Sequence, residues 1–469
     1  MTTHKQYDAI IIGSGQAGNP LAHKLADCGW TVALIERHHL GGSCINYGCT
    51  PTKTMLASAR VAHVARRSVD FGVETGDVTV DLPAIVARKN RIVHNMRSGQ
   101  EERVAERPSL DLYRGTGRFT GPHTVTVNDV DLRSEHIFIN TGARPRQPDI
   151  PGLEDVDALT NHSILDLEQL PEHLLVLGGS YIGLEFGQMF RRFGSRVTVI
   201  ERGDQIAPRE DEDVAQTLQE ALEEEGIQFH LGAEVNSVSA AGEGVTVATK
   251  QDGAADEIAG THLLLAVGRV PNTDALNLQA PGVKTDERGY VVVNERLETT
   301  APGVWALGDV KGGPAFTHIS FDDHFIVYKN LVEDAQPPRT IKNRIVPYAL
   351  FTDPELGRVG MTEKEARAAG YNLKVGSIPM AWVARARERG ETAGLMKIVI
   401  DADTDRILGA AILGSEGGEL VQTLKALMMA DAPWTLFKDA VFIHPTLSEG
   451  FFTLMDSVEA VDTDAGDVP

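Results

Sequence analysis

Cysteine is scarce in this chain, which has only three cysteines among 469 residues. So few thiols cannot form the disulfide framework that stabilises small secreted domains. The chain also lacks any apolar run that approaches the roughly 18 residues of a membrane-spanning helix. Its start, "MTTHKQYDAIIIG", has no apolar segment followed by a cleavage site, as a signal peptide would. These absences predict a cytoplasmic protein.

Basic residues are also in short supply. The 44 lysines and arginines face 66 aspartates and glutamates, which gives a formal net charge of −22 at pH 7. A surface of this sign repels the phosphate backbone of nucleic acids and the headgroups of anionic lipids. We therefore expect neither nucleic acid nor a membrane surface as a partner.

Glycine and apolar residues, in contrast, are plentiful, with 46 glycines and 42% hydrophobic residues. This composition is typical of a compact α/β enzyme and not of a disordered or fibrous chain. Because a single hydrophobic core stops growing at roughly 250–300 residues, the length predicts about three folded units.

The N-terminal stretch "YDAIIIGSGQAGNPLAHKLADCGWTVALIER" predicts a strand, a glycine turn, a helix and a second strand. Gly13, Gly15 and Gly18 have the spacing of a dinucleotide-binding turn, where glycine permits a tight turn and close contact with a pyrophosphate. The free N–H groups at the helix start bind the phosphates, and Glu36 at the end of the second strand can hydrogen-bond a ribose. Glycine turns are common, so a single copy is weak support.

The same pattern recurs in "HLLVLGGSYIGLEFGQMFRRFGSRVTVIERG", with Gly178, Ser180 and Gly183 at the turn and Glu201 after the next strand. The acid follows the first glycine at the same separation in both copies. Two turns with identically placed acids indicate two bound dinucleotides. Ser180 carries a Cβ atom where the first copy has glycine, so we expect looser binding at the second site and a retained cofactor at the first.

Two of the three cysteines, Cys44 and Cys49, lie close together in "GGSCINYGCTPTK". The alanine-rich stretch from Thr52 onward is predicted to be a helix, so both thiols lie at or just before its N-terminus. The helix dipole there lowers a thiol pKa and favours the reactive thiolate. A zinc site is the alternative, but it requires further Cys or His ligands at fixed spacing. The third cysteine, Cys28, is expected to be a buried small apolar residue within the first helix.

The cysteine segment and several later motifs together resemble the flavin-dependent pyridine-nucleotide:disulfide oxidoreductase family. The later motifs extend over almost the whole chain and are "INTGARP" (139–145), "AVGRVPN" (266–272), "VWALGDV" (304–310), "FTDPELGRVGMTE" (351–363) and "HPTLSE" (444–449). Within the family, the chain is most similar to mercuric-reductase-like and dihydrolipoamide-dehydrogenase-like enzymes. The resemblance implies FAD at the first turn and a nicotinamide cofactor at the second.

The resemblance also implies roles for individual residues in a redox site. Cys49 would face the flavin as a thiolate, and Cys44 would exchange with the substrate. Lys53 would form an ion pair with Glu185 beside the flavin. Further cofactor contacts in the motifs are Thr141, Gly142, Gly268, Gly308 and Asp309. For Asp309, a plain helix N-cap is the alternative.

His444 and Glu449 in "VFIHPTLSEG" complete the implied site. In disulfide reductases of this family, a His–Glu pair from the partner subunit reaches the exchanging cysteine, where the histidine carries a proton and the glutamate orients the imidazole. Histidine suits this task because its charge changes near neutral pH, and such acid–base help contributes about 10²–10⁴ in rate. If His444 acts on a neighbouring subunit, the active protein is a homodimer.

The predicted fold is α/β, with two Rossmann-like dinucleotide-binding domains and a C-terminal α+β dimerisation domain. The expected boundaries are 1–145 for the first part of the FAD-binding domain, 150–275 for the NAD(H)-binding domain, 276–345 for the second part of the FAD or central domain, and 346–469 for the interface domain. Within the interface domain, "KIVIDADTDRILGAAILG" predicts a hairpin and "GGELVQTLKALMMA" an amphipathic helix. The acidic last segment, "VEAVDTDAGDVP", is expected to be disordered.

The expected function is that of an NADH-dependent flavoprotein, which passes electrons from NADH through FAD to the Cys44–Cys49 disulfide and on to a small disulfide or another oxidant. NADH is preferred over NADPH in this hypothesis, because Glu201 would accept a ribose hydroxyl and repel a 2′-phosphate. The alternatives are a mercuric or other metal-ion reductase, a flavin oxidase and a non-catalytic flavin redox sensor. A dedicated mercuric reductase is disfavoured because no cysteine follows Cys49, whereas those enzymes end in a cysteine pair that delivers Hg²⁺.

Overall fold

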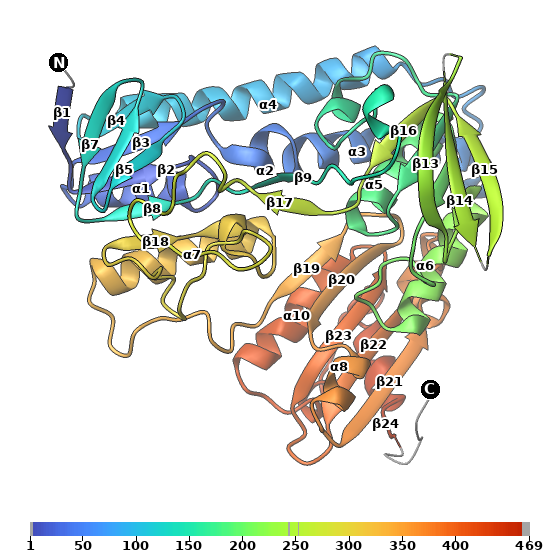
Figure 1. The fold of residues 1–469 in the computed structure, drawn as a ribbon. Helices are drawn as coiled ribbons and strands as arrows, with labels where there is room; N and C mark the ends of the chain where they lie inside the picture. Colours follow the sequence, from blue (N-terminus) through green and yellow to red (C-terminus); the bar gives the residue numbers. More distant parts are fainter. Residues whose placement is uncertain (1–2, 243, 252, 462–469) are drawn as a thin grey trace.

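The structure, a computed structural model, describes residues 3–242, 244–251 and 253–461. Figure 1 shows three groups of elements: an N-terminal group in blue and cyan, a green group beside it, and an orange-red C-terminal group below. The first two groups contain parallel sheets and the third an antiparallel sheet. This arrangement confirms the predicted α/β fold, with two Rossmann-like units and a C-terminal α+β unit.

The sheet of the first unit has the order β18-β8-β2-β3-β4, and all neighbouring strands in it run parallel. Strand β2 is buried at every position, because its two faces pack against different elements: one against helices α1 and α7, the other against a smaller β-sheet. A smaller sheet with the order β1-β7-β6-β5 adjoins it. The elements are β1 (Thr3–Gln6), β2 (Ala9–Ile12), α1 (Gly18–Asp27), β3 (Val32–Glu36), α2 (Gly42–Asn46), α3 (Cys49–Arg66), α4 (Leu82–Ala105), β4 (Leu110–Arg114), β5 (Arg118–Gly121), β6 (Thr124–Val127), β7 (Val130–Arg133), β8 (Ile137–Ile139), β18 (Val304–Ala306) and α7 (Thr317–Leu331).

The sheet of the second unit, β12-β11-β10-β16, repeats the layout of the first. In both, the strand before the glycine turn is central, the strand after the helix pairs on one side, and a later strand pairs on the other. The internal repeat seen in the sequence is therefore also a structural repeat. The elements are β10 (His173–Leu177), α5 (Tyr181–Phe193), β11 (Arg196–Ile200), α6 (Glu212–Glu224), β12 (Ile227–His230), β16 (His262–Leu265) and an antiparallel sheet of β13 (Glu234–Ala241), β14 (Gly244–Gln251) and β15 (Ala254–Gly260).

Two links join these units. Strand β17 (Arg269–Pro271) pairs antiparallel with β9 (Ala143–Pro145), so the chain enters and leaves the second unit along neighbouring strands. Strand β18 then pairs with β8, which returns the chain to the first sheet. The exact domain boundaries near residues 145, 275 and 345 stay predictions.

The C-terminal sheet has the order β19-β20-β23-β22-β21-β24. The predicted hairpin is formed by β22 and β23, and the predicted amphipathic helix is α10, which buries one apolar face against β20 and β23. The elements are β19 (Pro347–Leu350), β20 (Glu355–Gly360), α8 (Glu363–Ala368), β21 (Leu373–Pro379), α9 (Ala384–Glu388), β22 (Leu395–Asp401), β23 (Ile407–Gly414), α10 (Gly417–Met429), α11 (Thr435–Lys438), α12 (Gly450–Asp456) and β24 (Glu459–Ala460).

The segment expected to be disordered differs in part from that prediction. Glu459 and Ala460 form β24, which pairs antiparallel with Lys374 and Val375 of β21. The edge of β21 offers unpaired backbone groups, and these order the segment despite its acidic composition. Residues 462–469 lie outside the described part of the chain.

Candidate active site

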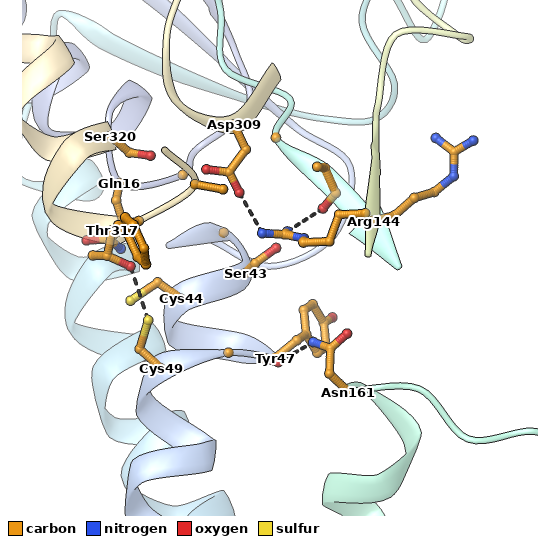
Figure 2. A pocket seen from close by; sticks show the side chains of 18 of the residues that line it. Gln16, Ser43, Cys44, Tyr47, Cys49, Arg144, Asn161, Asp309, Thr317 and Ser320 are labelled. Carbon is orange, nitrogen blue, oxygen red and sulfur yellow. Dashed lines mark hydrogen bonds and ion pairs between the residues drawn. The ribbon is translucent and has the colours of Figure 1, made fainter. Parts of the chain in front are cut away.

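A cavity of about 1450 Å³ lies where the three units meet. This volume exceeds the roughly 300–1,000 Å³ of a typical small-molecule site, so it can hold more than one cofactor. The predicted site residues that line it are Gly13, Gly15, Glu36, Cys44, Cys49, Lys53, Thr141, Gly142, Ser180, Glu185, Gly268 and Asp309. Those that lie outside its lining are Gly18, Gly178, Gly183, Glu201, Gly308, His444 and Glu449. Figure 2 shows the two cysteines next to Thr317, with Asp309 on the other side of Ser43.

The first glycine turn is held tightly against Asn140. Gly13 has a φ of +101°, and a Cβ atom there would overlap the carbonyl oxygen of Asn140. The Asn140 side chain accepts a hydrogen bond from Gly18 N–H at 2.8 Å and donates one to the carbonyl of Leu307 at 2.9 Å. A side chain on Gly15 would lie 2.9 Å from Asn140 Oδ1. The turn thus needs glycine for its own geometry and leaves backbone facing the cavity.

The second turn reproduces this geometry with one change. Gly178 has a φ of +105°, and a Cβ atom on Gly183 would overlap the carbonyl oxygen of Gly178. Ser180 is the N-cap of α5 in an extended conformation, and its side chain makes no capping hydrogen bond. The hydroxyl therefore remains available to the cavity at the position where the first turn has glycine.

Glu36 and Glu201 occupy equivalent positions in the two units. One carboxylate oxygen accepts from the N–H of the residue after the first glycine, at 3.0 Å for Glu36 and 2.7 Å for Glu201. The other accepts from the N–H two residues after the acid, at 2.8 Å in both. Each acid is thereby fixed beside its turn with lone pairs left over, as a ribose-binding carboxylate requires.

The two cysteines come from consecutive helices and are free thiols. Cys49 is the first residue of α3, as expected for a thiol at a helix N-terminus, whereas Cys44 lies within a separate short helix, α2, just before it. Cys49 Sγ lies 3.1 Å from Thr317 Oγ1 at the start of α7. The positive end of the α3 dipole therefore acts most directly on Cys49.

The electrostatic environment separates the two thiols. The pKa of Cys49 is lowered to about 6, first by a hydrogen bond from Cys44 and further by the Thr317 hydroxyl and the charge of Lys53. The pKa of Cys44 is raised, first because it donates that hydrogen bond and second because it is buried. These opposite shifts favour a reduced state in which Cys49 carries the negative charge and Cys44 the proton.

Lys53 and Glu185 form an ion pair on the cavity wall. Lys53 Nζ lies 2.7 Å and 3.0 Å from the two carboxylate oxygens of Glu185, which is buried. The Phe351 N–H also donates to Glu185 at 3.0 Å, and its ring lies 4.6 Å from Lys53 Nζ. The lysine charge is thus held one helical turn from Cys49.

The hydroxyl of Thr317 yields a testable expectation. Thr317→Val keeps the shape of the side chain and removes the hydroxyl, so we expect the pKa of Cys49 to rise above its value of about 6. The expected rise is about 1–2 units, since a hydrogen bond to a charged group contributes about 1.5–3 kcal/mol and one unit corresponds to about 1.4 kcal/mol. Because a depressed pKa keeps the thiolate populated above it, the variant loses the thiolate at a higher pH as the solution is acidified.

The measurement is a pH titration of the thiolate absorbance in the two-electron-reduced holoenzyme. Thr317→Ser keeps the hydroxyl and is the matched control, which should titrate as the native protein does. A midpoint in Thr317→Val equal to that of the control would contradict the assigned role of the hydroxyl.

Asp309 lies on the cavity wall within a short 3₁₀ helix, Gly308–Lys311. It does not act as the N-cap, because the cap residue is Leu307 and no side chain caps the helix. Instead its Oδ2 accepts from Arg269 Nη1 at 2.6 Å. The carboxylate thus remains directed into the cavity, with a cation beside it.

Thr141, Gly142 and Gly268 also lie at the cavity, where they contribute mainly backbone. Thr141 Oγ1 donates to the carbonyl of Asn272 at 2.8 Å, and the Asn272 N–H donates to Gly142. Gly142 and Gly268 have no neighbouring atoms where a Cβ would stand, because both face the cavity. Gly308 instead packs against the side chains of Asn140 and Ser320, so it lies behind two residues that line the cavity.

His444 and Glu449 lie outside this cavity, on the surface of the C-terminal unit. His444 Nδ1 is 2.9 Å and 3.0 Å from the oxygens of Glu449, and the His444 side chain is 69% exposed. Nearby Val441 and Ile443 are 99% and 79% exposed. An exposed apolar loop of this kind is typical of a surface that binds another protein.

The prediction that Cys28 is buried within the first helix is wrong. Cys28 is the C-cap of α1 and is exposed, with its Sγ 2.9 Å from the hydroxyl of Tyr328. The buried stripe of α1 ends with Leu25 and Ala26, so the helix terminates before it can carry Cys28 into the core.

Three residues of the site were not identified from the sequence: Asn140, Arg269 and Thr317. Asn140 and Arg269 lie inside the family motifs, directly beside Thr141 and Gly268. Because they are polar residues within those motifs, the sequence could have indicated them as site residues. Thr317 lies in no quoted motif, and nothing local distinguishes it from an ordinary helix-start threonine. Its contact with Cys49 depends entirely on how α7 packs.

The fold and the cavity define a class of protein, namely enzymes that bind two dinucleotides around a redox-active dithiol. Residues 7–323 match the family described as pyridine nucleotide-disulphide oxidoreductase, and residues 346–455 match its dimerisation domain. The chain belongs to the pyridine nucleotide-disulphide oxidoreductase family. It is therefore an FAD-dependent enzyme that also uses a pyridine nucleotide.

Several relatives cover nearly the whole chain. It is 38% identical to the probable pyridine nucleotide-disulfide oxidoreductase RclA of Escherichia coli (strain K12), over 97% of this chain and 100% of that one. It is 37% identical to a dihydrolipoyl dehydrogenase of Thermus scotoductus, over 98% of each chain. It is 34% identical to a mercuric reductase of Staphylococcus aureus, over 95% of this chain and 81% of the relative.

A solved structure is also similar throughout its length. The Cu(II) complex of the HOCl-induced flavoprotein disulfide reductase RclA from Escherichia coli has a TM-score of 0.88 and 38% identity, and the match covers 96% of this chain and 99% of that one. In the part of the chain that the structure describes, no helix is long and apolar enough to cross a membrane.

Proposed function

We propose that this protein is an NADH-dependent flavoprotein reductase, which uses the Cys44–Cys49 dithiol to reduce a small disulfide or another small oxidant. The observation that carries the proposal is that this dithiol lines the same cavity as Gly13 and Gly15 of the first turn and Ser180 of the second. The separation of the two thiol pKa values supports it, because one sulfur is ready to attack while the other holds a proton.

The first turn fits FAD. Its glycines leave no room for a Cβ atom, Glu36 is fixed for a ribose, and Asp309 directs a carboxylate into the cavity. When bound there, FAD supplies a carrier that takes two electrons from NADH and delivers them to a disulfide. Lys53 would hold a positive charge beside that carrier, and Glu185 would keep the lysine in place.

The cysteines would then perform thiol–disulfide exchange with the acceptor. Cys44, once deprotonated, attacks one sulfur of the acceptor and forms a mixed disulfide while the other half leaves as a thiolate. Cys49 attacks the Cys44 sulfur, releases the second thiolate and closes the Cys44–Cys49 disulfide. The two thiolates take up two protons, and one NADH supplies the two electrons that restore the dithiol. Because the pKa of Cys44 is raised, its deprotonation requires a base.

We assign that base to His444 of the partner subunit in a homodimer. The dimerisation-domain match and the exposed loop around His444 support this assignment. Within one protomer, His444 does not line the cavity that holds Cys44. Glu449 would orient the imidazole through Nδ1 and leave Nε2 free to exchange a proton.

The preferred pyridine nucleotide is a testable part of the proposal. Glu201 stands beside the second turn with both oxygens already bound to backbone N–H groups, so it cannot swing away from a 2′-phosphate. We expect kcat/KM for NADH to exceed that for NADPH by roughly tenfold to a hundredfold, which corresponds to about 1–3 kcal/mol. Glu201→Gln removes the charge and should bring the kcat/KM values for NADH and NADPH closer together. Equal or better use of NADPH by the native enzyme would contradict the proposal.

Cu(II) is a second candidate acceptor, favoured by one observation. The RclA relative with 38% identity and a TM-score of 0.88 has been solved as a Cu(II) complex. Thiolates are ligands that suit copper in its reduced form. Reduction of two Cu(II) ions would consume the same two electrons as one disulfide.

One assay separates the candidates. Purified holoenzyme is supplied with NADH and, in turn, small disulfides, Cu(II), Hg²⁺, quinones and oxygen alone, with a reducible disulfide as the expected acceptor. Steady turnover with Cu(II) but no disulfide would favour the second candidate. Efficient turnover with Hg²⁺ would favour a mercuric reductase, rapid turnover with oxygen alone an oxidase, and no turnover with any acceptor a redox sensor.

A further inference from the structure

A buried carboxylate beside the second turn has no part in the dithiol chemistry described above. Glu210 lies in the loop between β11 and α6, and its side chain is fully buried. Burying a carboxylate without good partners costs several kcal/mol, so such a group is retained only where its contacts matter. Its partners are two tyrosine hydroxyls and one arginine.

The two tyrosines come from different units and share one oxygen of Glu210. Tyr181, the first residue of α5, donates to Glu210 Oε1 at 2.9 Å, and Tyr348 of β19 donates to the same atom at 2.8 Å. The two rings lie 5.6 Å apart, and both line the cavity. Phe316, directly before Thr317, stacks on Tyr348 at 5.1 Å with an interplanar angle of 12°. The rings form a continuous aromatic wall, defined here as Tyr181, Tyr348 and Phe316.

The other carboxylate oxygen of Glu210, and the residue that follows it, contact the C-terminal unit. Its Oε2 lies 3.7 Å from Nε of Arg358, a fully buried arginine on β20 whose nitrogens make no hydrogen bond among the described residues. The next residue, Asp211, accepts from the N–H groups at the start of α8 and lies 3.5 Å from Lys397 Nζ. The loop that carries Glu210 is therefore held against the C-terminal unit by hydrogen bonds and an ion pair of Asp211.

The same loop is also tied to the second glycine turn. The Ala207 N–H donates to the carbonyl of Gly179 at 2.8 Å, and the Gly179 N–H donates to Glu201 at 2.7 Å. Tyr181 is the residue after Ser180, and one helical turn later Glu185 binds Lys53. A reduced pyridine nucleotide bound at this turn would extend into the cavity next to the aromatic wall, because Ser180 and all three rings line that cavity.

We propose that Glu210 is a positioning residue for the pyridine nucleotide, because it holds the hydroxyls of Tyr181 and Tyr348 and so fixes the wall beside which the nicotinamide must lie. The proposal rests on the proposed function, in which the second turn binds NADH. Among the described residues, the side chain of Glu210 bonds to Tyr181, Tyr348 and Arg358 and to neither cysteine. Its loss should impair reduction of the enzyme by NADH and leave reoxidation by the acceptor intact.

The test measures the two half-reactions separately by rapid mixing of anaerobic holoenzyme. Glu210→Ala should slow reduction by NADH about tenfold to a hundredfold, the size of effect expected when a reacting group is misplaced by about 1 Å. Reoxidation of the pre-reduced variant by a small disulfide should stay within about twofold of native. Glu210→Gln keeps an oxygen that accepts from both phenols, so it should recover most of the reduction rate although it lacks the charge.

Asp211→Ala is the matched control, because it removes the neighbouring buried carboxylate, which binds no tyrosine. If Asp211→Ala slows reduction as much as Glu210→Ala does, the effect is only structural and the proposal fails. It also fails if Glu210→Ala is reduced at the native rate, or if both half-reactions slow equally. Should Glu210→Ala not fold, Tyr348→Phe carries the test, with a smaller slowing of reduction expected and none of reoxidation.

The rate at which NADH reduces the native holoenzyme separates the role of Glu210 from the proposed function as an NADH-dependent reductase. If neither NADH nor NADPH reduces the native holoenzyme, the proposed function fails and the role of Glu210 fails with it. If NADH reduces the native enzyme and Glu210→Ala equally fast, only the role of Glu210 fails.

Discussion

Cys44→Ser is expected to abolish disulfide reduction, with a loss of activity on the order of 10³-fold or more. Serine cannot form the mixed disulfide or close the internal one, and removal of a covalent nucleophile can cost up to about 10⁶ in rate. The remaining Cys49 has no sulfur partner, so it should stay a thiolate above about pH 6, the value to which its pKa is lowered. The serine hydroxyl can donate the hydrogen bond that Cys44 gives now.

The visible spectrum distinguishes this variant from its counterpart. A Cys49 thiolate beside oxidised FAD should give Cys44→Ser a long-wavelength absorbance band without any reductant, and the band should fade as the pH falls below about 6. Cys49→Ser should be equally inactive but lack the band. Cys28→Ser is the matched control, because Cys28 is exposed at the end of α1 and outside the cavity lining, and should behave as native. Identical spectra for Cys44→Ser and Cys49→Ser would overturn the assignment of the two sulfurs.

His444→Gln is expected to lower the rate with the disulfide acceptor by about a hundredfold, within the range of 10²–10⁴ for general acid–base catalysis. The raised pKa of Cys44 creates the need for a base, and the thiolate that leaves the acceptor needs a proton. Glutamine keeps a similar shape but carries no proton between sites. Glu449→Gln, which only weakens the orientation of the imidazole, should cost less.

Mixed dimers test whether His444 acts across the subunit boundary. Cys44→Ser and His444→Gln subunits are each defective alone, but a dimer that contains one of each has one site with Cys44 and His444 both intact. We therefore expect activity to return when the two variants are denatured, mixed and refolded together. A mixture as inactive as its parts would show that His444 does not serve a neighbouring Cys44. Equal activity of native and His444→Gln enzymes would remove His444 from the mechanism altogether.

The parts of the site that could be predicted from the sequence are those made by short stretches of chain. The turns at Gly13 and Gly178 were recognisable because a positive φ and a close backbone contact exclude other residues, so glycine spacing records the geometry directly. Glu36 and Glu201 were recognisable because a strand–turn–helix–strand unit places its last strand at a set distance from its first. The burial of Cys28 was predicted wrongly, because the end of α1 could not be located to within a residue.

The chain's amino-acid order by itself determined the two dinucleotide turns, the paired cysteines and the α/β fold, because each depends on backbone preferences and hydrophobic patterns within about 30 residues. Only the tertiary structure decided which distant groups complete the site. Thr317 reaches Cys49 across 268 residues, and Tyr348 reaches Glu210 across 138. Such contacts form because buried polar groups must find partners wherever packing brings helices and strands together, and no local pattern records which partner that is. Sequence alone therefore indicates the chemistry, whereas packing decides which groups surround each sulfur and which rings form the aromatic wall.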